Sequence, residues 1–123
     1  MEQIILHLVG DFVTQTQWMA VNKSQSNFAA GIHALVYALP FLFIGSLGAV
    51  SFIFATHFLV DRFTLARYVC FAKNWVTTPS LRWADVWETG YPKEVPVWLA
   101  TSLVIVVDNT IHLSCNYAAL LFL

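Results

Sequence analysis

Four apolar runs, each about as long as a lipid bilayer is thick, set the strongest limit on how this chain can fold. A helix that crosses the hydrocarbon core needs about 20 mostly apolar residues. The runs that approach this length cover residues 2–21, 28–44, 48–72 and 97–122. Only 11% of the 123 residues are charged, whereas soluble domains carry about 25%. The sequence therefore predicts an all-α polytopic membrane protein, a bundle of four transmembrane helices in one domain, residues 1–123.

Short polar stretches separate these runs. NKSQSN, residues 22–27, has turn chemistry, and Ser26 or Asn27 can cap the helix that follows. IGSLGA, residues 44–49, predicts a tight turn. Pro40 is expected to kink the second helix near its end, because proline cannot donate the backbone hydrogen bond.

The one long polar stretch lies between residues 74 and 96. Thr78 or Ser80 can cap a short helix there, and Gly90 can end it. The helix is expected to lie in the headgroup layer, where tryptophans are enriched. An alternative is a gate for substrate over a buried site. The tryptophans expected to anchor the segment are Trp75, Trp83 and Trp87.

The basic residues predict how the bundle is oriented. Lys23 follows the first run, and the other five Lys and Arg residues lie between positions 62 and 93. With four spans, all six lie toward one side, which the positive-inside rule makes cytoplasmic. Both termini are then expected to face the periplasm or the exterior. No basic tract indicates a nucleic-acid partner.

Ionisable residues recur inside the apolar runs. All four histidines and three of the four aspartates lie there, namely His7, Asp11, His33, His57, Asp61, Asp108 and His112. Three His/Asp pairs are four residues apart, a spacing that places both side chains on one helix face. Gln15 extends the first such face, and Tyr37 lies four residues after the lone histidine of the second run. Both are candidates to contact the other groups and hold them in orientation.

These groups also share a depth. At about 1.5 Å of rise per residue, Asp11, His57 and Asp108 each lie near the middle of their run, and most of the set falls in a layer on the order of 10 Å thick. An aspartate at the centre of a membrane helix costs about 2.5–3.5 kcal/mol. A shared centre that neutralises the carboxylates is therefore expected.

Three explanations of the centre are open. Imidazole and carboxylate form a ligand set suited to a divalent metal, zinc first and iron or manganese next, and the set is large enough for two ions. The carboxylates can instead orient the imidazoles as indirect partners of the metal. The residues can also form a metal-free proton relay or hydrogen bonds between helices. The sequence has no HExxH motif.

The segment HLVGDFVTQTQWMAVNK, together with the lone His33, HFLVD and DNTIH, resembles domain-of-unknown-function family 3307, small membrane proteins of bacteria and their phages. The resemblance spans nearly the whole chain and implies a bacterial inner (host cell) membrane. The positions that match its motifs are His7, Asp11, Gln15, His33, His57, Asp61, Asp108 and His112. The resemblance brings no activity with it, although the motifs are similar in style to those of small membrane-bound metal-dependent hydrolases.

These observations leave three alternative functions. The first is a metal-dependent hydrolase in which Asp11 or Asp61 takes a proton from metal-bound water and the substrate is lipid-like or a membrane peptide. The second is a transporter or channel for metal ions or protons, which would need several copies of so small a chain. The third is a phage-encoded interaction protein that binds a host membrane protein, with a structural His/Asp cluster. The lipid bilayer is a partner in each case.

Overall fold

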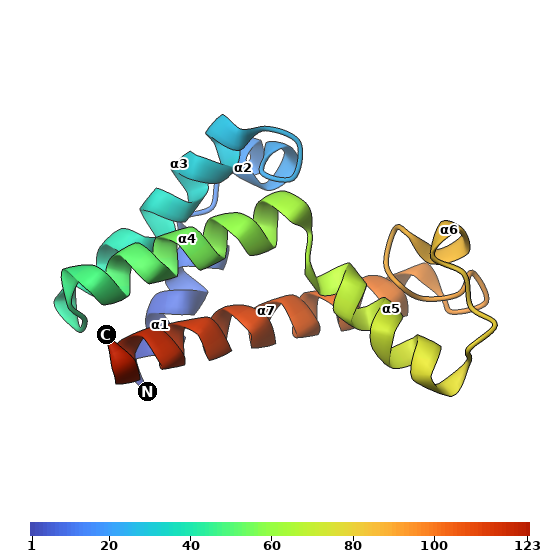
Figure 1. Cartoon of the computed structure of the whole chain (residues 1–123). Coiled ribbons are helices and arrows are strands. Elements are labelled where there is room, and N and C mark those ends of the chain that lie inside the picture. Colours follow the sequence, from blue (N-terminus) through green and yellow to red (C-terminus); the bar gives the residue numbers. More distant parts are fainter. The chain divides into compact units, whose positions relative to one another are not determined.

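A computed structural model describes all 123 residues, which form helices joined by turns (Figure 1). The prediction of an all-α fold is confirmed. The chain packs as two compact units, the first made of residues 1–63 with 112–123 and the second of residues 64–111. The single membrane domain expected from the sequence stays a prediction.

The first apolar run is interrupted, and the expected single helix over residues 2–21 is wrong. It forms α1 (Glu2–Leu8), the π-helical turn η1 (Val9–Val13) and α2 (Gln17–Asn22). The hydroxyl of Thr14 donates to the Gly10 carbonyl at 3.0 Å. Thr16 then caps α2 by accepting from the backbone N–H of Met19. Side chains that bond the local backbone compete with helix continuation, which explains the break.

The second run folds close to its predicted bounds, as α3 (Asn27–Ala38) continued by the 3-10 helix η2 (Leu39–Phe43). Ser26 is the N-cap, and its hydroxyl accepts from the N–H of Ala29. The change from α to 3-10 geometry occurs at Pro40, which lacks the N–H that an α-helix would use there. Both the cap and the distortion follow the sequence prediction.

The third run is also broken, and the expected continuous helix over residues 48–72 is wrong. It forms α4 (Leu47–Phe63) and α5 (Ala66–Thr77). Thr64 lies between them with a φ of 48°, in the left-handed region. A residue in this conformation does not continue a right-handed helix, and nothing in the apolar pattern marked it.

The fourth run is α7 (Val97–Phe122), with the predicted bounds. Of all the helices, α7 alone is long and apolar enough to cross a membrane, and α4 with α5 would add a second crossing only as one interrupted span. The segment Asn27–Phe43 is apolar but shorter. A bundle of four spans is therefore not supported, because two of the four runs are broken.

The second unit holds the expected short helix, α6 (Trp83–Val86). The predicted caps are wrong: Arg82 occupies the N-cap position, and its side chain makes no capping bond. Gly90 does close the turn after the helix, since its N–H donates to the Val86 carbonyl at 2.7 Å. Its φ of 78° suits glycine, and a Cβ there would lie 2.5 Å from the backbone of α5.

The three tryptophans of this unit differ in exposure. Trp75 and Trp87 are about half exposed, at 49% and 53%. Trp83 is half-buried and stacks on Tyr68, with ring centroids 4.6 Å apart. Their role as membrane anchors stays a prediction.

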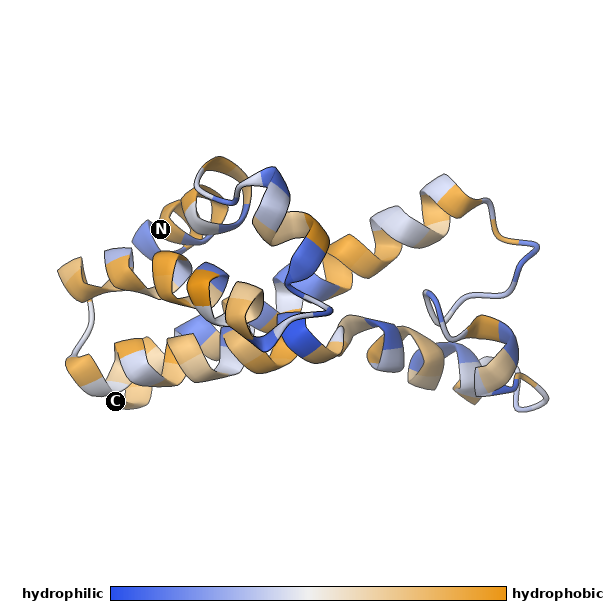
Figure 2. Ribbon diagram, turned by 90° about the horizontal axis from the view of Figure 1, so that it is seen from above, coloured by the Kyte–Doolittle hydropathy of each residue, from blue (hydrophilic) through white to orange (hydrophobic).

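Small residues let the helices of the first unit approach closely. Ala38, Ala49 and Ala119 are buried beside Tyr37 and Ile53 in one apolar cluster. This cluster supports the base of the polar centre described next, because Tyr37 belongs to both. Hydrophobic segments recur along the helical ribbon, interspersed with hydrophilic ones (Figure 2).

Candidate metal centre

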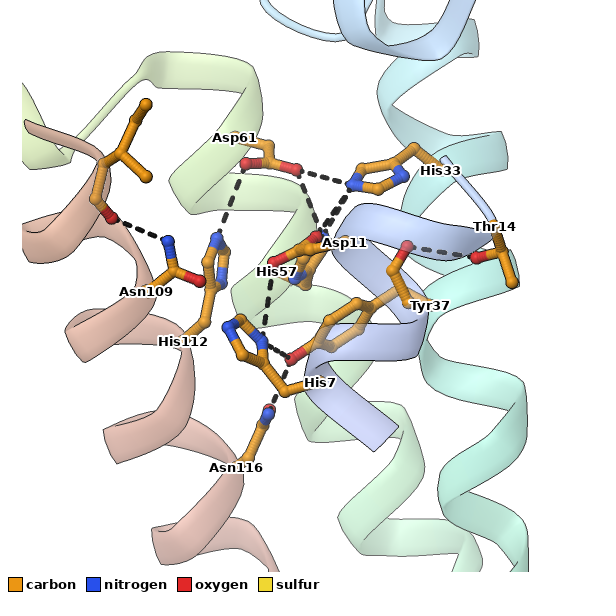
Figure 3. A network of polar contacts seen from close by, with 12 residues as sticks. His7, Asp11, Thr14, His33, Tyr37, His57, Asp61, Asn109, His112 and Asn116 are labelled. Carbon is orange, nitrogen blue, oxygen red and sulfur yellow. Dashed lines mark hydrogen bonds and ion pairs between the residues drawn. The ribbon is translucent and has the colours of Figure 1, made fainter. Parts of the chain in front are cut away.

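Six of the predicted ionisable residues meet inside the first unit, each no more than 7% exposed. They come from five elements, so the centre exists only when the unit is folded (Figure 3). The residues and their elements are His7 of α1, Asp11 of η1, His33 of α3, His57 and Asp61 of α4, and His112 of α7.

Four side chains form the innermost group, which we call the inner tetrad: Asp11, His33, His57 and Asp61. The two histidine Nε2 atoms lie 3.0 Å apart. The Asp11 Oδ1 atom lies 3.3 Å and 3.4 Å from the Nε2 atoms of His33 and His57. The Asp61 Oδ2 atom lies 3.1 Å from each of them.

The inner tetrad has the size of a tetrahedral zinc site. Zinc binds nitrogen and carboxylate oxygen at about 2.0–2.2 Å, which places tetrahedral ligand atoms about 3.3–3.6 Å from one another. The five distances above run from 3.0 to 3.4 Å, at or just below that range. Calcium usually takes six to eight oxygen ligands, whereas this group offers two nitrogens and two carboxylates.

One atom of the inner tetrad lacks a hydrogen-bond donor. Asp11 Oδ1 is buried without a partner, although it faces two imidazole nitrogens. A buried carboxylate oxygen left without a donor is costly. The Nδ1 atoms of His33 and His57 also have no partner, so the Nε2 atoms are the only ones on these rings that meet other polar groups. A cation between them would satisfy Asp11 Oδ1 and both Nε2 atoms together.

The other two histidines contact the outer oxygens of the same carboxylates. His7 Nδ1 lies 3.4 Å from Asp11 Oδ2, and His112 Nε2 lies 3.4 Å from Asp61 Oδ1. Both histidines were predicted to be metal ligands. Each contacts a carboxylate oxygen outside the inner tetrad, and His112 and Asp61 also belong to a second group that could hold a metal ion. The expected role of both histidines as ligands stays a prediction.

Tyr37 contacts two histidines of the centre. Its ring stacks on His57, with centroids 3.6 Å apart and planes 17° apart. Its hydroxyl lies 2.7 Å from His7 Nδ1 and accepts from Asn116 Nδ2 at 2.6 Å. Gly10 makes room for this ring, since a Cβ at that position would lie 2.5 Å from the Tyr37 Cδ2 atom.

The contacts of Asn116 and Lys23 with the centre were not predicted from the sequence. Asn116 lies four residues after His112, so extending the same helix face by one turn would have found it. Lys23 Nζ forms an ion pair with Asp61 Oδ2 at 3.0 Å. Its signal was its place at the polar end of an apolar run, from which a long side chain reaches back to buried acids.

Two other predicted residues are not members of the inner tetrad. The side-chain oxygen of Gln15 is buried without a hydrogen-bond partner, and its expected supporting role stays a prediction. Asp108 lies on α7 in the part of the helix that belongs to the second unit. Its expected role as a ligand stays a prediction.

Together these features define a class, an all-α protein with a buried histidine–aspartate centre that could hold a metal ion. The chain matches the family model described as "Protein of unknown function (DUF3307)" over residues 1–121. It therefore belongs to this family, as the motifs indicated. No curated protein and no solved structure matches the chain.

Proposed function

We propose that this chain is a membrane protein whose inner tetrad binds a divalent transition metal, with zinc the best match. The observation that carries the proposal is the agreement between the tetrad distances of 3.0–3.4 Å and tetrahedral zinc geometry. Charge supports it too, because the two carboxylates, Asp11 and Asp61, bring the two negative charges that a divalent ion balances.

The surface supports a lipid partner. Every helical element from α1 to α4 exposes large apolar side chains. Examples are Ile5, Phe12, Phe28, Phe43 and Phe52. Soluble monomers rarely expose large contiguous apolar patches. With α7 as a membrane-crossing helix, these side chains would face acyl chains. The bacterial inner membrane, with the basic residues on its cytoplasmic side, fits this picture.

Hydrolysis is the activity that the ligand types favour. Structural zinc sites use mostly cysteine, whereas catalytic sites use sets such as two histidines and one carboxylate and keep a fourth position for water. His33, His57 and Asp11 form such a set. Asp61 would then give up the fourth position to water and accept the proton of that water. The substrate would be lipid-like or a membrane peptide, because the unit is enclosed by apolar surface.

A second candidate, a proton or metal-ion pathway, is favoured by one observation. Polar contacts of 3.4 Å or less run without a gap from Lys23 through Asp61, His57 and Asp11 to His7, and on to Tyr37 and Asn116. Chains of this kind line proton paths in membrane proteins. Flux into liposomes that stops with Asp61→Asn would favour this candidate over the hydrolase.

Elemental analysis of the purified protein tests the metal proposal. Wild type, prepared in mild detergent without chelators, should retain about one metal ion per chain. His57→Ala and Asp11→Asn should lose it, while the matched control His7→Gln should keep it, because His7 lies outside the inner tetrad. Far-UV circular dichroism checks that each variant remains helical. Wild type that holds no metal after incubation with zinc and removal of free ions would refute the proposal.

A further inference from the structure

Lys23 is the one permanently charged cation that contacts Asp61, a member of the inner tetrad. Its ammonium nitrogen lies 3.0 Å from Asp61 Oδ2. That oxygen is also a member of the tetrad, 3.1 Å from both Nε2 atoms. The ammonium and a bound metal ion would therefore share one carboxylate oxygen.

The distances show how close the two cations would come. A metal ion lies about 2.0–2.2 Å from a ligand oxygen. Lys23 Nζ lies 3.0 Å from the same atom, so the two positive centres would be no more than about 5 Å apart. Like charges at this separation in a protein interior repel strongly.

The charge count leads to the same conclusion. Without a metal ion, Lys23 balances one of the two carboxylate charges of Asp11 and Asp61. A divalent ion balances both, and the ammonium is then in excess. The ion pair is favourable in the metal-free centre and unfavourable in the loaded one.

The surroundings of Lys23 allow its side chain to leave without the backbone moving. The side chain is 21% exposed, whereas that of Asp61 is 3% exposed. The following turn is fixed independently by Arg62, which donates to the Ser24 carbonyl at 2.7 Å and to Asn27 Oδ1 at 2.6 Å. A flexible lysine on a fixed turn can exchange the carboxylate for water.

We infer that Lys23 is the counter-ion that an incoming metal displaces from Asp61, so that it sets the affinity of the centre and the rate at which the ion leaves. The inference rests on the proposed metal site and extends it. Lys23 holds Asp61 in place while the centre is empty of metal, and it weakens binding by competing for the same oxygen. The centre is thereby suited to exchange its ion rather than to hold it permanently.

Zinc affinity, measured by competition with a chromophoric chelator in detergent micelles, tests this. Lys23→Met should bind zinc about tenfold more tightly than wild type, which corresponds to roughly 1.4 kcal/mol of binding free energy. It should also release zinc more slowly. Lys23→Arg should stay near wild type. The matched control Lys73→Met removes the same charge from the second unit and should leave the affinity within about twofold, well under the 1.4 kcal/mol step.

A second measurement needs no variant. Acetylation of Lys23 in the wild-type chain, followed by mass spectrometry, should increase when zinc is added, because the amine leaves the carboxylate. Equal or weaker affinity in Lys23→Met, or labelling that zinc does not change, would overturn the inference while the metal site stands. Absence of zinc binding in every variant would overturn the metal site and the inference together.

Discussion

The contact between Gly10 and Tyr37 gives a sharp test of how tightly the centre is packed. In Gly10→Ala the new Cβ would lie 2.5 Å from Tyr37 Cδ2 and 3.1 Å from Cε2. Carbon atoms in contact normally lie about 3.5–4.0 Å apart, so the ring would have to move by about 1 Å. The ring cannot move freely, because Tyr37 is fully buried and stacked on His57.

We expect Gly10→Ala to lower the free energy of unfolding by about 1–3 kcal/mol, the usual cost of overpacking a core. Gly31→Ala is the matched control, since a Cβ at this position in α3 meets nothing within 4 Å. There alanine should stabilise the helix by about 0.5–1 kcal/mol. The two variants should therefore shift stability in opposite directions.

Thermal unfolding in detergent micelles, followed by far-UV circular dichroism, measures both changes. Zinc affinity provides a second readout, because a displaced Tyr37 ring would push the His57 imidazole out of the inner tetrad. Gly10→Ala as stable as Gly31→Ala, with unchanged zinc affinity, would refute the packing argument.

Three further predictions follow from the first unit. Tyr37→Phe keeps the stacked ring but leaves His7 and Asn116 without their shared hydroxyl, and should lower the free energy of unfolding by about 1–3 kcal/mol in the same thermal assay. Ser26→Ala removes the N-cap of α3 and should cost about 1 kcal/mol, with Ser26→Asn close to wild type in denaturant titration. Zinc at about 100 times its dissociation constant should stabilise wild type by about 2.7 kcal/mol, a gain that a chelator reverses and that the His57→Ala variant lacks.

The sequence predicted which residues meet in the centre better than it predicted how their atoms are arranged. The spacing of four residues placed His57 and Asp61 on one face of α4, and both point into the cluster. Spacing alone did not separate the inner tetrad from its neighbours, because His7 and His112 obey the same rule yet contact the outer carboxylate oxygens. That distinction depends on tertiary packing, which brings atoms from five elements within a few ångströms.

The breaks in the helices were hidden for a related reason. Thr14–Thr16 and Thr64 each lie between apolar segments, so the polar residues at these sites were interpreted as parts of one span. The interruptions arise from hydrogen bonds of threonine side chains at the first site and from a left-handed residue at the second. Where capping chemistry was strong, as at Ser26, the sequence located the helix start correctly.

The wide turn Val9–Val13 has an evolutionary consequence. π-Helical turns of this kind contain one residue more than an α-helical turn and occur often at functional sites. Deleting a single residue from it would rotate the preceding and following side chains by about 100° relative to each other. His7 and Asp11 would then no longer face the same partners. Single-residue deletions between positions 8 and 13 should thus be absent from working relatives, even where the exposed apolar residues of the same segment vary freely.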